Sequence, residues 1–519
     1  MRHNAGLRLL TLLVALTAVV ECEWCVAKFA NAQAGERLLP PPVKREFRAA
    51  WVATVANIDW PSRRDLSSDQ QQVELREIVA AAAAMNLNAI VFQVRPAADA
   101  VYASPLEPWS EFLTGQMGQA PEGGYDPLEL LIELCHQRGI EVHAWLNPYR
   151  ASHPSGSGEF SETHISRVHP ELVLKYGEYL WLDPGLPQAE DHTIAVICDV
   201  VQRYDVDGIH FDDYFYPYPV SDEQRRELPF PDERSWQMAR DRGVNLSRED
   251  WRRDNVNRMV KRVRAEIGRV KPHVRFGISP FGIWRPGYPE GIVGFDAYEK
   301  LYADARLWLQ EGDVDYLSPQ LYWSVDSQGQ GYTKLLGWWH EQNRWQRHLW
   351  PGLYTSRLNP ESATGWDADE ILRQIAATRH QEGATGNIHF SFKALQRNWR
   401  DIARQLPYDE PALVPATPWL EIPVHDEPNA TISVENGQLS VAMRLSEAVS
   451  AAPAPWLWVV QERYPDRWRT SVVPGWRSDY RLPRRDDGGV AILPDMVSVT
   501  AVNRACVSGA VALIKVDQP

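Results

Sequence analysis

Eight short apolar runs rich in β-forming residues alternate with helical patterns between residues 44 and 406, and this alternation constrains the fold more than any other feature. The β-rich runs are Phe47–Val55, Ala89–Val94, Glu141–Leu146, Gly208–Phe211, Val274–Ile278, Val314–Leu321, Leu349–Tyr354 and Ile388–Phe392. The helical patterns between most of them include Asp69–Met85, Pro127–Arg138, Ile194–Tyr204, Asp250–Val270, Thr333–Gln346 and Asp367–Gln381. Strands that alternate with helices form parallel sheets, so this pattern predicts an α/β fold closed into a (β/α)₈ TIM barrel over residues 44–406. An open doubly wound sheet is the alternative, but it favours a glycine-rich phosphate turn after the first strand, and the sequence has none there.

The chain begins with a pattern typical of a secretory signal peptide. Arg2 and Arg8 precede the apolar run 9–20, and a small-residue cleavage pattern ends at Ala34. The apolar run is shorter than the roughly 20 residues that a membrane-spanning helix needs, so an uncleaved anchor is the less favoured alternative. We predict a signal peptide over residues 1–34 and a periplasmic or secreted, envelope-associated protein without a membrane span in the mature chain.

The composition changes near residue 411, where a second structural unit is expected to begin. Pro411, Pro415, Pro418 and Pro423 predict a Pro-rich linker over residues 407–428. Short alternating runs follow, and they predict a small all-β sandwich of fibronectin or immunoglobulin type over residues 429–519. These runs are Thr431–Val434, Gln438–Arg444, Trp456–Gln461, Val490–Leu493, Met496–Asn503 and Ala510–Val516.

The net charge argues against nucleic acid as a ligand, and the His and Cys spacing argues against a bound metal. The formal net charge is -14, whereas a nucleic-acid-binding protein needs a basic face to neutralise phosphates. The sequence has no His-Glu-x-x-His run and no pair of Cys-x-x-Cys motifs, so we predict neither a metal nor a cofactor. The 22 Trp and 19 Tyr residues can supply flat faces for ring-shaped ligands such as sugars.

The C-terminal ends of the predicted strands carry the candidate chemistry, because the active sites of TIM barrels lie at that face. Asp212 and Asp213 end an apolar strand, where ionised groups are costly without a purpose or a partner. Strand alternation separates Asp212 from Phe211, so Asp212 is predicted to face the lumen as a nucleophile. Asp213 begins the next loop and is predicted to be the acid or an orienting group. Two carboxyl groups are what glycoside hydrolysis needs.

Other polar and aromatic residues at these strand ends are predicted to bind a hydroxyl-rich substrate. They are Asn57, Asp59, Trp60, Arg95, Asp99, Tyr102, Trp145, Asn147, Tyr149, His210, Tyr214, Trp284, Gln320, Tyr322 and Trp323. Structural roles compete with this interpretation. Asp212 and Asp213 can instead cap a helix or pair with arginine. Asp59 can be a turn residue, and His210 can be a satisfied core histidine.

Six strand ends carry a family resemblance. The segments are 45–54 with 57–61, 93–96, 144–150, 207–215, 277–282 and 318–323. In order along the chain, they resemble the bacterial glycosyl hydrolase-like ten family. The resemblance implies a TIM barrel related to polysaccharide hydrolases, in a family with an envelope member that cleaves peptide-free peptidoglycan strands. It also implies that Asp212 stands where amylase-type barrels carry their nucleophile.

The sequence departs from the amylase pattern at the fifth strand, which ends in Ser279-Pro280-Phe281-Gly282 without a glutamate. The proton donor is then Asp213 or a loop carboxylate such as Asp99 or Asp326. We predict a glycoside hydrolase that cleaves O-glycosidic bonds of a polysaccharide partner, with peptidoglycan glycan strands as the favoured substrate. The alternative is a non-catalytic carbohydrate-binding barrel that has lost its acid.

Overall fold

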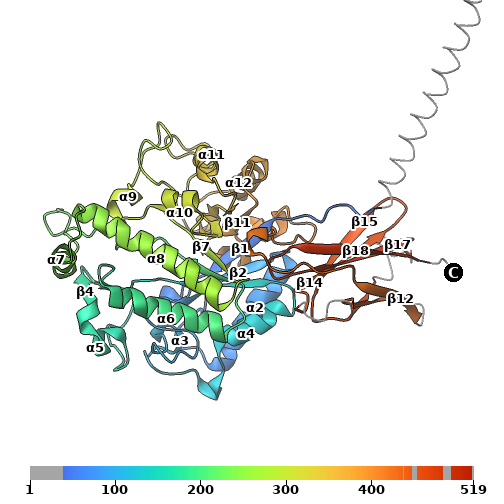
Figure 1. The fold of residues 1–519 in the computed structure, drawn as a ribbon, viewed down its shortest axis with the longest axis horizontal. Coiled ribbons are helices and arrows are strands. Elements are labelled where there is room, and N and C mark those ends of the chain that lie inside the picture. The colour runs from blue at the N-terminus through green and yellow to red at the C-terminus, as the bar shows by residue number, and fades with distance from the viewer. Residues whose placement is uncertain (1–38, 436–437, 447–452, 483–492, 517–519) are drawn as a thin grey trace, which may run out of the picture.

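The computed structural model describes residues 39–435, 438–446, 453–482 and 493–516. Figure 1 shows a larger α/β body on one side and a smaller all-β body on the other. The predicted signal peptide, residues 1–34, lies outside the described residues. Among the residues that are described, none of the helices combines the length and the apolar character needed to cross a membrane.

The α/β body is built on a closed parallel sheet, which confirms the predicted TIM barrel. Its strands are β1 (Phe47–Val52), β2 (Ala89–Arg95), β3 (Glu141–Leu146), β6 (Gly208–Phe211), β7 (Arg275–Ile278), β8 (Tyr316–Leu317), β9 (His348–Leu349), β10 (Gly352–Leu353) and β11 (Gly386–His389). They pair in the order β10-β11-β1-β2-β3-β6-β7-β8-β9. The ends of this order meet because β9 and β10 are two halves of one predicted strand, separated by Trp350 and Pro351. Proline has no N–H for the ladder, so the strand is interrupted there without opening the barrel.

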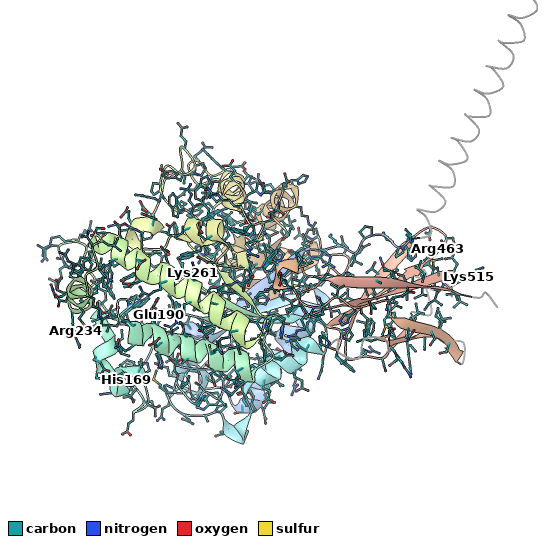
Figure 2. The ribbon with its side chains drawn as sticks, in the orientation of Figure 1. His169, Glu190, Arg234, Lys261, Arg463 and Lys515 are labelled. Atoms are coloured by element: carbon teal, nitrogen blue, oxygen red, sulfur yellow. The ribbon has the colours of Figure 1, made fainter. Side chains whose placement is uncertain are left out.

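Helices cover the outside of the barrel. The longer ones are α2 (Ser68–Ala84), α4 (Pro127–His136), α6 (Pro187–Arg203), α7 (Glu233–Asp241), α8 (Arg248–Val270), α10 (Ala305–Glu311), α11 (Tyr332–Gln342) and α12 (Ala368–His380). The short ones are α3 (Glu111–Thr114), α5 (Ile165–Val168), α9 (Ala297–Lys300), α13 (Phe392–Gln396) and α14 (Ile402–Gln405). Local sequence fixes where helices begin: Ser67 and Gln70 form a capping box at α2. Between α6 and α8, Glu190 pairs with Arg258 and Arg262, and Figure 2 shows Glu190 and Lys261 on these adjoining helices.

The long loop after β3 contains a hairpin that the sequence analysis did not predict. Its strands are β4 (Val173–Tyr176) and β5 (Tyr179–Leu182). Arg150 bridges to Trp181, so the hairpin is attached to the end of β3. Figure 2 places His169 of this loop and Arg234 of α7 at the end of the molecule opposite Arg463 and Lys515 of the all-β body.

The C-terminal body is the predicted sandwich, formed by a three-stranded and a four-stranded sheet. Its strands are β12 (Asn429–Glu435), β13 (Gln438–Arg444), β14 (Leu457–Arg463), β15 (Trp468–Pro474), β16 (Asp479–Arg481), β17 (Met496–Val502) and β18 (Ser508–Lys515). Val441, Trp458, Val460 and Val499 pack between the sheets. The sequence analysis missed β15 and β16, and most of its predicted run 490–493 lies outside the described residues.

The segment predicted as a Pro-rich linker joins the two bodies and is packed against the barrel. Leu413 lies beside Arg45 in a parallel bridge, and Thr417 accepts a hydrogen bond from Arg275 at 2.8 Å. Phe47, Leu413, Trp456 and Leu457 belong to one apolar cluster beneath the barrel. The sandwich therefore covers the N-terminal ends of the barrel strands and leaves their C-terminal ends free for a site.

Candidate active site

A cavity of about 320 Å³ lies at the C-terminal ends of the barrel strands. Its polar lining comes from Gln93, Arg150, Asp212, Asp213, Ser279 and Gln320. Its aromatic lining includes Trp51, Trp145, Tyr214, Tyr218, Tyr322 and Tyr354. A few hydrogen-bonding groups on an aromatic wall are the usual composition of a small-molecule or sugar site.

Asp212 is held rigidly at the floor of this cavity. Trp145 Nε1 donates to Asp212 Oδ2 at 3.0 Å, and Asn147 Nδ2 donates to Oδ1 at 3.0 Å. Burial raises the pKa of Asp212, while nearby Arg150 and the Trp145 and Asn147 hydrogen bonds oppose that rise. Both donors come from β3 or the residue after it, so the neighbouring strand fixes the orientation of this carboxyl group.

Asp213 lies next to Asp212 and has a different set of partners. The Tyr218 hydroxyl donates a short hydrogen bond to Asp213. Burial raises the pKa of Asp213 to about 6, and the neighbouring Asp212 charge adds to the rise, whereas the Tyr218 and Gln320 contacts lower it. A carboxyl group with this pKa is partly protonated in mildly acidic to neutral solution, as a general acid must be.

Neither aspartate is neutralised by an ion pair. Over the described ranges, no Lys or Arg nitrogen is recorded within ion-pair distance of Asp212 or Asp213. Each is only 4% exposed. Arg150 lines the same cavity and acts on Asp212 from beyond ion-pair distance, while the Asp212 charge raises the pKa of the neighbouring Asp213. This arrangement argues against the interpretation that they merely pair with arginine.

His210 lies below the two aspartates, where it is hydrogen-bonded to core residues and does not line the cavity. Trp51 Nε1 donates to His210 Nε2 at 3.0 Å, and His210 Nδ1 lies 3.0 Å from the Tyr316 hydroxyl. Burial holds the pKa of His210 well below its usual range, so the ring is neutral. His210 faces the lumen as predicted, but it is fully buried and supports the floor instead of lining the cavity.

The predicted site residues divide into those that line the cavity and those that do not. Asp212, Asp213, Trp145, Tyr214, Gln320 and Tyr322 line it. Asn147 lies behind it, hydrogen-bonded to Asp212. Their roles in binding or catalysis stay predictions, but their placement together agrees with the sequence analysis.

Three aromatic residues predicted to contact substrate are in the core instead. Trp60, Tyr102 and Tyr149 are each 0% exposed. Trp60 Nε1 donates to the carbonyl of Gln71 in α2 at 3.1 Å, which turns the ring towards the helices. Tyr102 packs edge-on against Tyr204. Position near a strand end was therefore not sufficient, because the chain turns outwards immediately after the strand.

Two further tryptophans lie outside the cavity lining for the same reason. Trp284 stacks on Trp338 of α11 with 5.8 Å between ring centroids, and its Nε1 donates to Asp304 at 3.0 Å. Trp323 packs edge-on against Phe281. Both belong to or pack against the main apolar core, so the structure does not support them as sugar platforms.

Arg95, Asn57 and Asp59 join neighbouring loops instead of lining the cavity. Arg95 is fully buried and pairs with Glu107. Asn57 Nδ2 donates to the carbonyls of Pro61 and Phe112. Asp59 accepts hydrogen bonds from the Ser391 hydroxyl and the Lys393 N–H, which ties the end of β1 to the chain after β11.

The three candidates for the proton donor are separated by the fold. Asp213 lines the cavity beside Asp212. Asp326 pairs with Arg373 at 2.7 Å and its side chain is 75% exposed at the surface. Asp99 lines a different cavity. Asp213 is therefore the one of the three that is positioned to act with Asp212.

The sequence analysis did not select several residues that line the cavity. Gln93 Oε1 accepts the N–H groups of Thr54 and Val55, which leaves its Nε2 without a partner among the described residues. Tyr354 directly follows β10, and Tyr218 lies in the loop several residues beyond β6. Gln93 and Tyr354 were therefore visible in the sequence at strand ends, whereas Tyr218 had no such signal.

No group of three or more His, Cys, Asp or Glu side chains arranged to hold a metal ion occurs within the described ranges. The carboxyl groups of the cavity are arranged with aromatic and amide donors instead.

Comparison with known proteins identifies the family. Residues 46–367 match the family described as Glycosyl hydrolase-like 10, a range that covers more than half of the chain. The chain belongs to the glycosyl hydrolase-like 10 family. Glycosyl hydrolase YngK of Bacillus subtilis (strain 168) is 42% identical over 409 residues, which are 76% of this chain and 78% of that protein. Glycosyl hydrolase DigH of Escherichia coli (strain K12) is 34% identical over 371 residues, which are 66% of this chain and 82% of that protein.

Among solved structures, the PgaB (BpsB) glycoside hydrolase domain from Bordetella bronchiseptica aligns with a TM-score of 0.45 and 13% identity. The alignment covers 70% of this chain and 99% of that domain. The family membership confirms the resemblance seen at the six strand ends. This member of the glycosyl hydrolase-like 10 family carries Ser279, not a glutamate, where the fifth strand reaches the cavity.

Proposed function

We propose that this protein is a periplasmic or secreted glycoside hydrolase that cleaves O-glycosidic bonds within a polysaccharide, with peptide-free peptidoglycan glycan strands as the substrate. The observation that carries the proposal is the pair Asp212 and Asp213, buried without an ion pair on the floor of an aromatic-lined cavity. Family relatives bear the name glycosyl hydrolase, which supports the reaction class.

In the mechanism that this geometry favours, Asp213 supplies the proton. With a pKa of about 6, its carboxyl group can protonate the glycosidic oxygen as the bond to the anomeric carbon breaks. Asp212 is held by Trp145 and Asn147 facing the same space, and in its ionised form it can attack the anomeric carbon or accept a proton from water. Product stereochemistry distinguishes these routes, because a covalent intermediate gives retention and direct attack by water gives inversion.

The aromatic lining accounts for binding of a sugar chain. Trp145, Tyr214, Tyr322 and Tyr354 present ring faces or edges to the cavity, and sugar C–H groups pack on such surfaces. Gln93 Nε2, buried and without a partner among the described residues, is available to donate to a sugar hydroxyl. The predicted signal peptide supports a proposal in which the enzyme works in the compartment where peptidoglycan lies.

Product release from purified glycans tests the proposal. The mature protein is incubated with peptide-free peptidoglycan strands, intact sacculi and α-glucans, and soluble fragments are identified by mass spectrometry. We expect fragments from the peptide-free strands and their loss in Asp212→Asn. Asp367→Asn serves as the matched control, because the Asp367 side chain is 87% exposed and far from the cavity lining.

The outcomes separate hydrolysis from binding. Fragments from α-glucans alone would replace the proposed substrate and keep the reaction class. Absence of fragments from every glycan, with retained binding by both the wild type and Asp212→Asn, would favour a carbohydrate-binding barrel. Unchanged activity in Asp212→Asn would show that the catalytic assignment is wrong.

A further inference from the structure

A second cavity, also of about 320 Å³, adjoins the candidate active site. His153 lines both cavities, so a single ring forms the wall between them. The other walls come from the loop after β2, from the rest of the loop after β3 and from the β4–β5 hairpin, which contributes Lys175 and Tyr179. All of these segments follow C-terminal strand ends, and the second cavity therefore continues the same face of the barrel.

The wall of the second cavity contains a buried carboxyl group. Asp99 is 0% exposed and lines the cavity. Its Oδ1 accepts the N–H of Ala97 at 2.7 Å, and the Ser110 side chain also contacts the carboxyl group. Asp99 Oδ2 nevertheless makes no hydrogen bond of normal geometry within the described residues, so it keeps the capacity to accept one from a ligand.

The walls of the second cavity are already fixed. Glu111 accepts hydrogen bonds from Arg64 and from the N–H of Ser157, which anchors the loop after β3. His153 Nδ1 lies 2.7 Å from the Ser155 hydroxyl, and its ring meets Tyr179 edge-on at 6.0 Å. Burial and Arg150 lower the pKa of His153 to about 4, so the dividing ring is neutral.

We propose that the second cavity is a sugar subsite, which holds one sugar unit while a neighbouring unit of the same glycan chain lies at Asp212 and Asp213. This inference rests on the proposed function. Asp99 Oδ2 accepts a hydrogen bond from a sugar hydroxyl or amide N–H, and half-buried Tyr179 provides the ring surface. The lining carries both signs of charge, with Lys175 as well as the acidic Asp99 and Glu178, so hydroxyl and amide groups of the sugar, not its net charge, are the features recognised.

Binding of fragments of graded length tests the subsite. Asp212→Asn, which binds without turnover, is titrated calorimetrically with peptide-free peptidoglycan fragments of two, four and six sugars. We expect affinity to rise with length. Adding Tyr179→Ala should weaken the binding of the six-sugar fragment by about tenfold and leave the two-sugar fragment nearly unchanged. Tyr288→Ala is the matched control, because Tyr288 is 47% exposed and lines neither cavity.

A second variant, Asp99→Asn, tests the subsite without removing a large side chain. Asp99→Asn keeps the shape and the acceptor for Ala97 but presents an N–H donor where the acceptor oxygen stood, so it should also weaken only the longer fragments. Equal weakening of short and long fragments, or none, would overturn the subsite, as would failure of every fragment to bind. If the enzyme with Tyr179→Ala cleaves the six-sugar fragment as well as the enzyme with Tyr179, the subsite is wrong and the hydrolase proposal stands. If binding depends on fragment length and on Tyr179 but the wild type cleaves nothing, the hydrolase proposal is wrong and the subsite stands.

Discussion

At the N-terminal end of the barrel, buried carboxyl groups have cationic partners, whereas at the C-terminal end Asp212 and Asp213 are buried without one. Below the barrel, Asp207 pairs with His136 at 2.9 Å and with Arg504 of the sandwich at 2.9 Å. Glu141 pairs with Arg275 at 3.0 Å. The Arg504 contact joins the barrel to the sandwich, while the His136 and Arg275 contacts lie within the barrel.

The pKa values of the buried carboxyl groups are consequently shifted in opposite directions at the two ends of the barrel. Burial alone would raise the pKa of Asp207, but Arg504 and His136 outweigh it and hold the pKa below its usual range. Burial raises the pKa of Asp213 to about 6, with Asp212 adding to the rise. Paired charges stabilise the contact between the barrel and the sandwich. Carboxyl groups without an ion pair can instead hold a proton and transfer it. The comparison indicates that the sandwich closes the structural end and that chemistry is confined to the other.

The largest expected effect is on activity at the C-terminal end. Asp213→Asn removes the proton donor, so kcat on a natural glycan should fall by about 10³-fold. A substrate with an activated phenol leaving group needs less protonation and should lose far less activity. Steady-state kinetics on both substrates checks this. Equal losses on the two would contradict the role of Asp213 as the acid.

At the opposite end, Asp207→Asn should affect stability and leave chemistry intact. It leaves Arg504 with a weakened partner in a buried network, which typically costs about 3 kcal/mol. Urea unfolding of the variant should show the loss, while kcat of the folded protein stays at the wild-type value. Arg504→Met, which removes the cation instead, should also destabilise. A fall in kcat without a change in stability would contradict a purely structural role for Asp207 at the N-terminal end of the barrel.

The pH dependence of stability should also differ between the ends. Because the pKa of Asp213 is raised in the folded state, its contribution is fully present below pH 3.8 and is lost as the pH rises through about 6. The pKa of Asp207 is lowered, so its contribution is present above pH 3.8 and is lost as the pH falls further.

Thermal melts between pH 4 and pH 7 measure the difference. Asp213→Asn should be more stable than the wild type at pH 7 by about 1–3 kcal/mol and by less at pH 4. Asp367→Asn provides the exposed-carboxylate control. A constant offset between the curves across this range would contradict the raised pKa.

The smallest expected effect is a shift in the pH profile of activity. The Tyr218 hydroxyl lowers the pKa of Asp213 by donating to it, so Tyr218→Phe should raise that pKa. The alkaline limb of kcat against pH should then move to higher pH, with only a several-fold change in the maximum. Tyr214→Phe, on the same loop but without a hydrogen bond to Asp213 in the described structure, is the comparison variant. If the alkaline limb of the pH profile does not move, Tyr218 does not set the pKa of the catalytic acid.

The sequence pattern predicted the barrel strands and selected Asp212 and Asp213 as candidates, because strands and their ends can be recognised from local periodicity. The strand Glu141–Leu146 was predicted with its observed bounds, and so was Gly208–Phe211. Alternation along the latter placed His210 and Asp212 on the lumen side. Trp60 and Trp284 were predicted incorrectly because a residue just beyond a strand follows the turn of its loop, which periodicity does not describe.

What the sequence by itself determined is the barrel, the C-terminal sandwich and the concentration of polar and aromatic residues at one set of strand ends. Only the tertiary structure decided how Asp212 and Asp213 differ. Trp145 and Asn147 reach Asp212 from β3, and Tyr218 reaches Asp213 from the following loop. Long-range packing also leaves Asp212 and Asp213 without an ion pair in the described structure and brings Arg504, nearly 300 residues away, to Asp207. The physical reason is that pKa values depend on burial and on neighbours in space, which one-dimensional spacing does not specify.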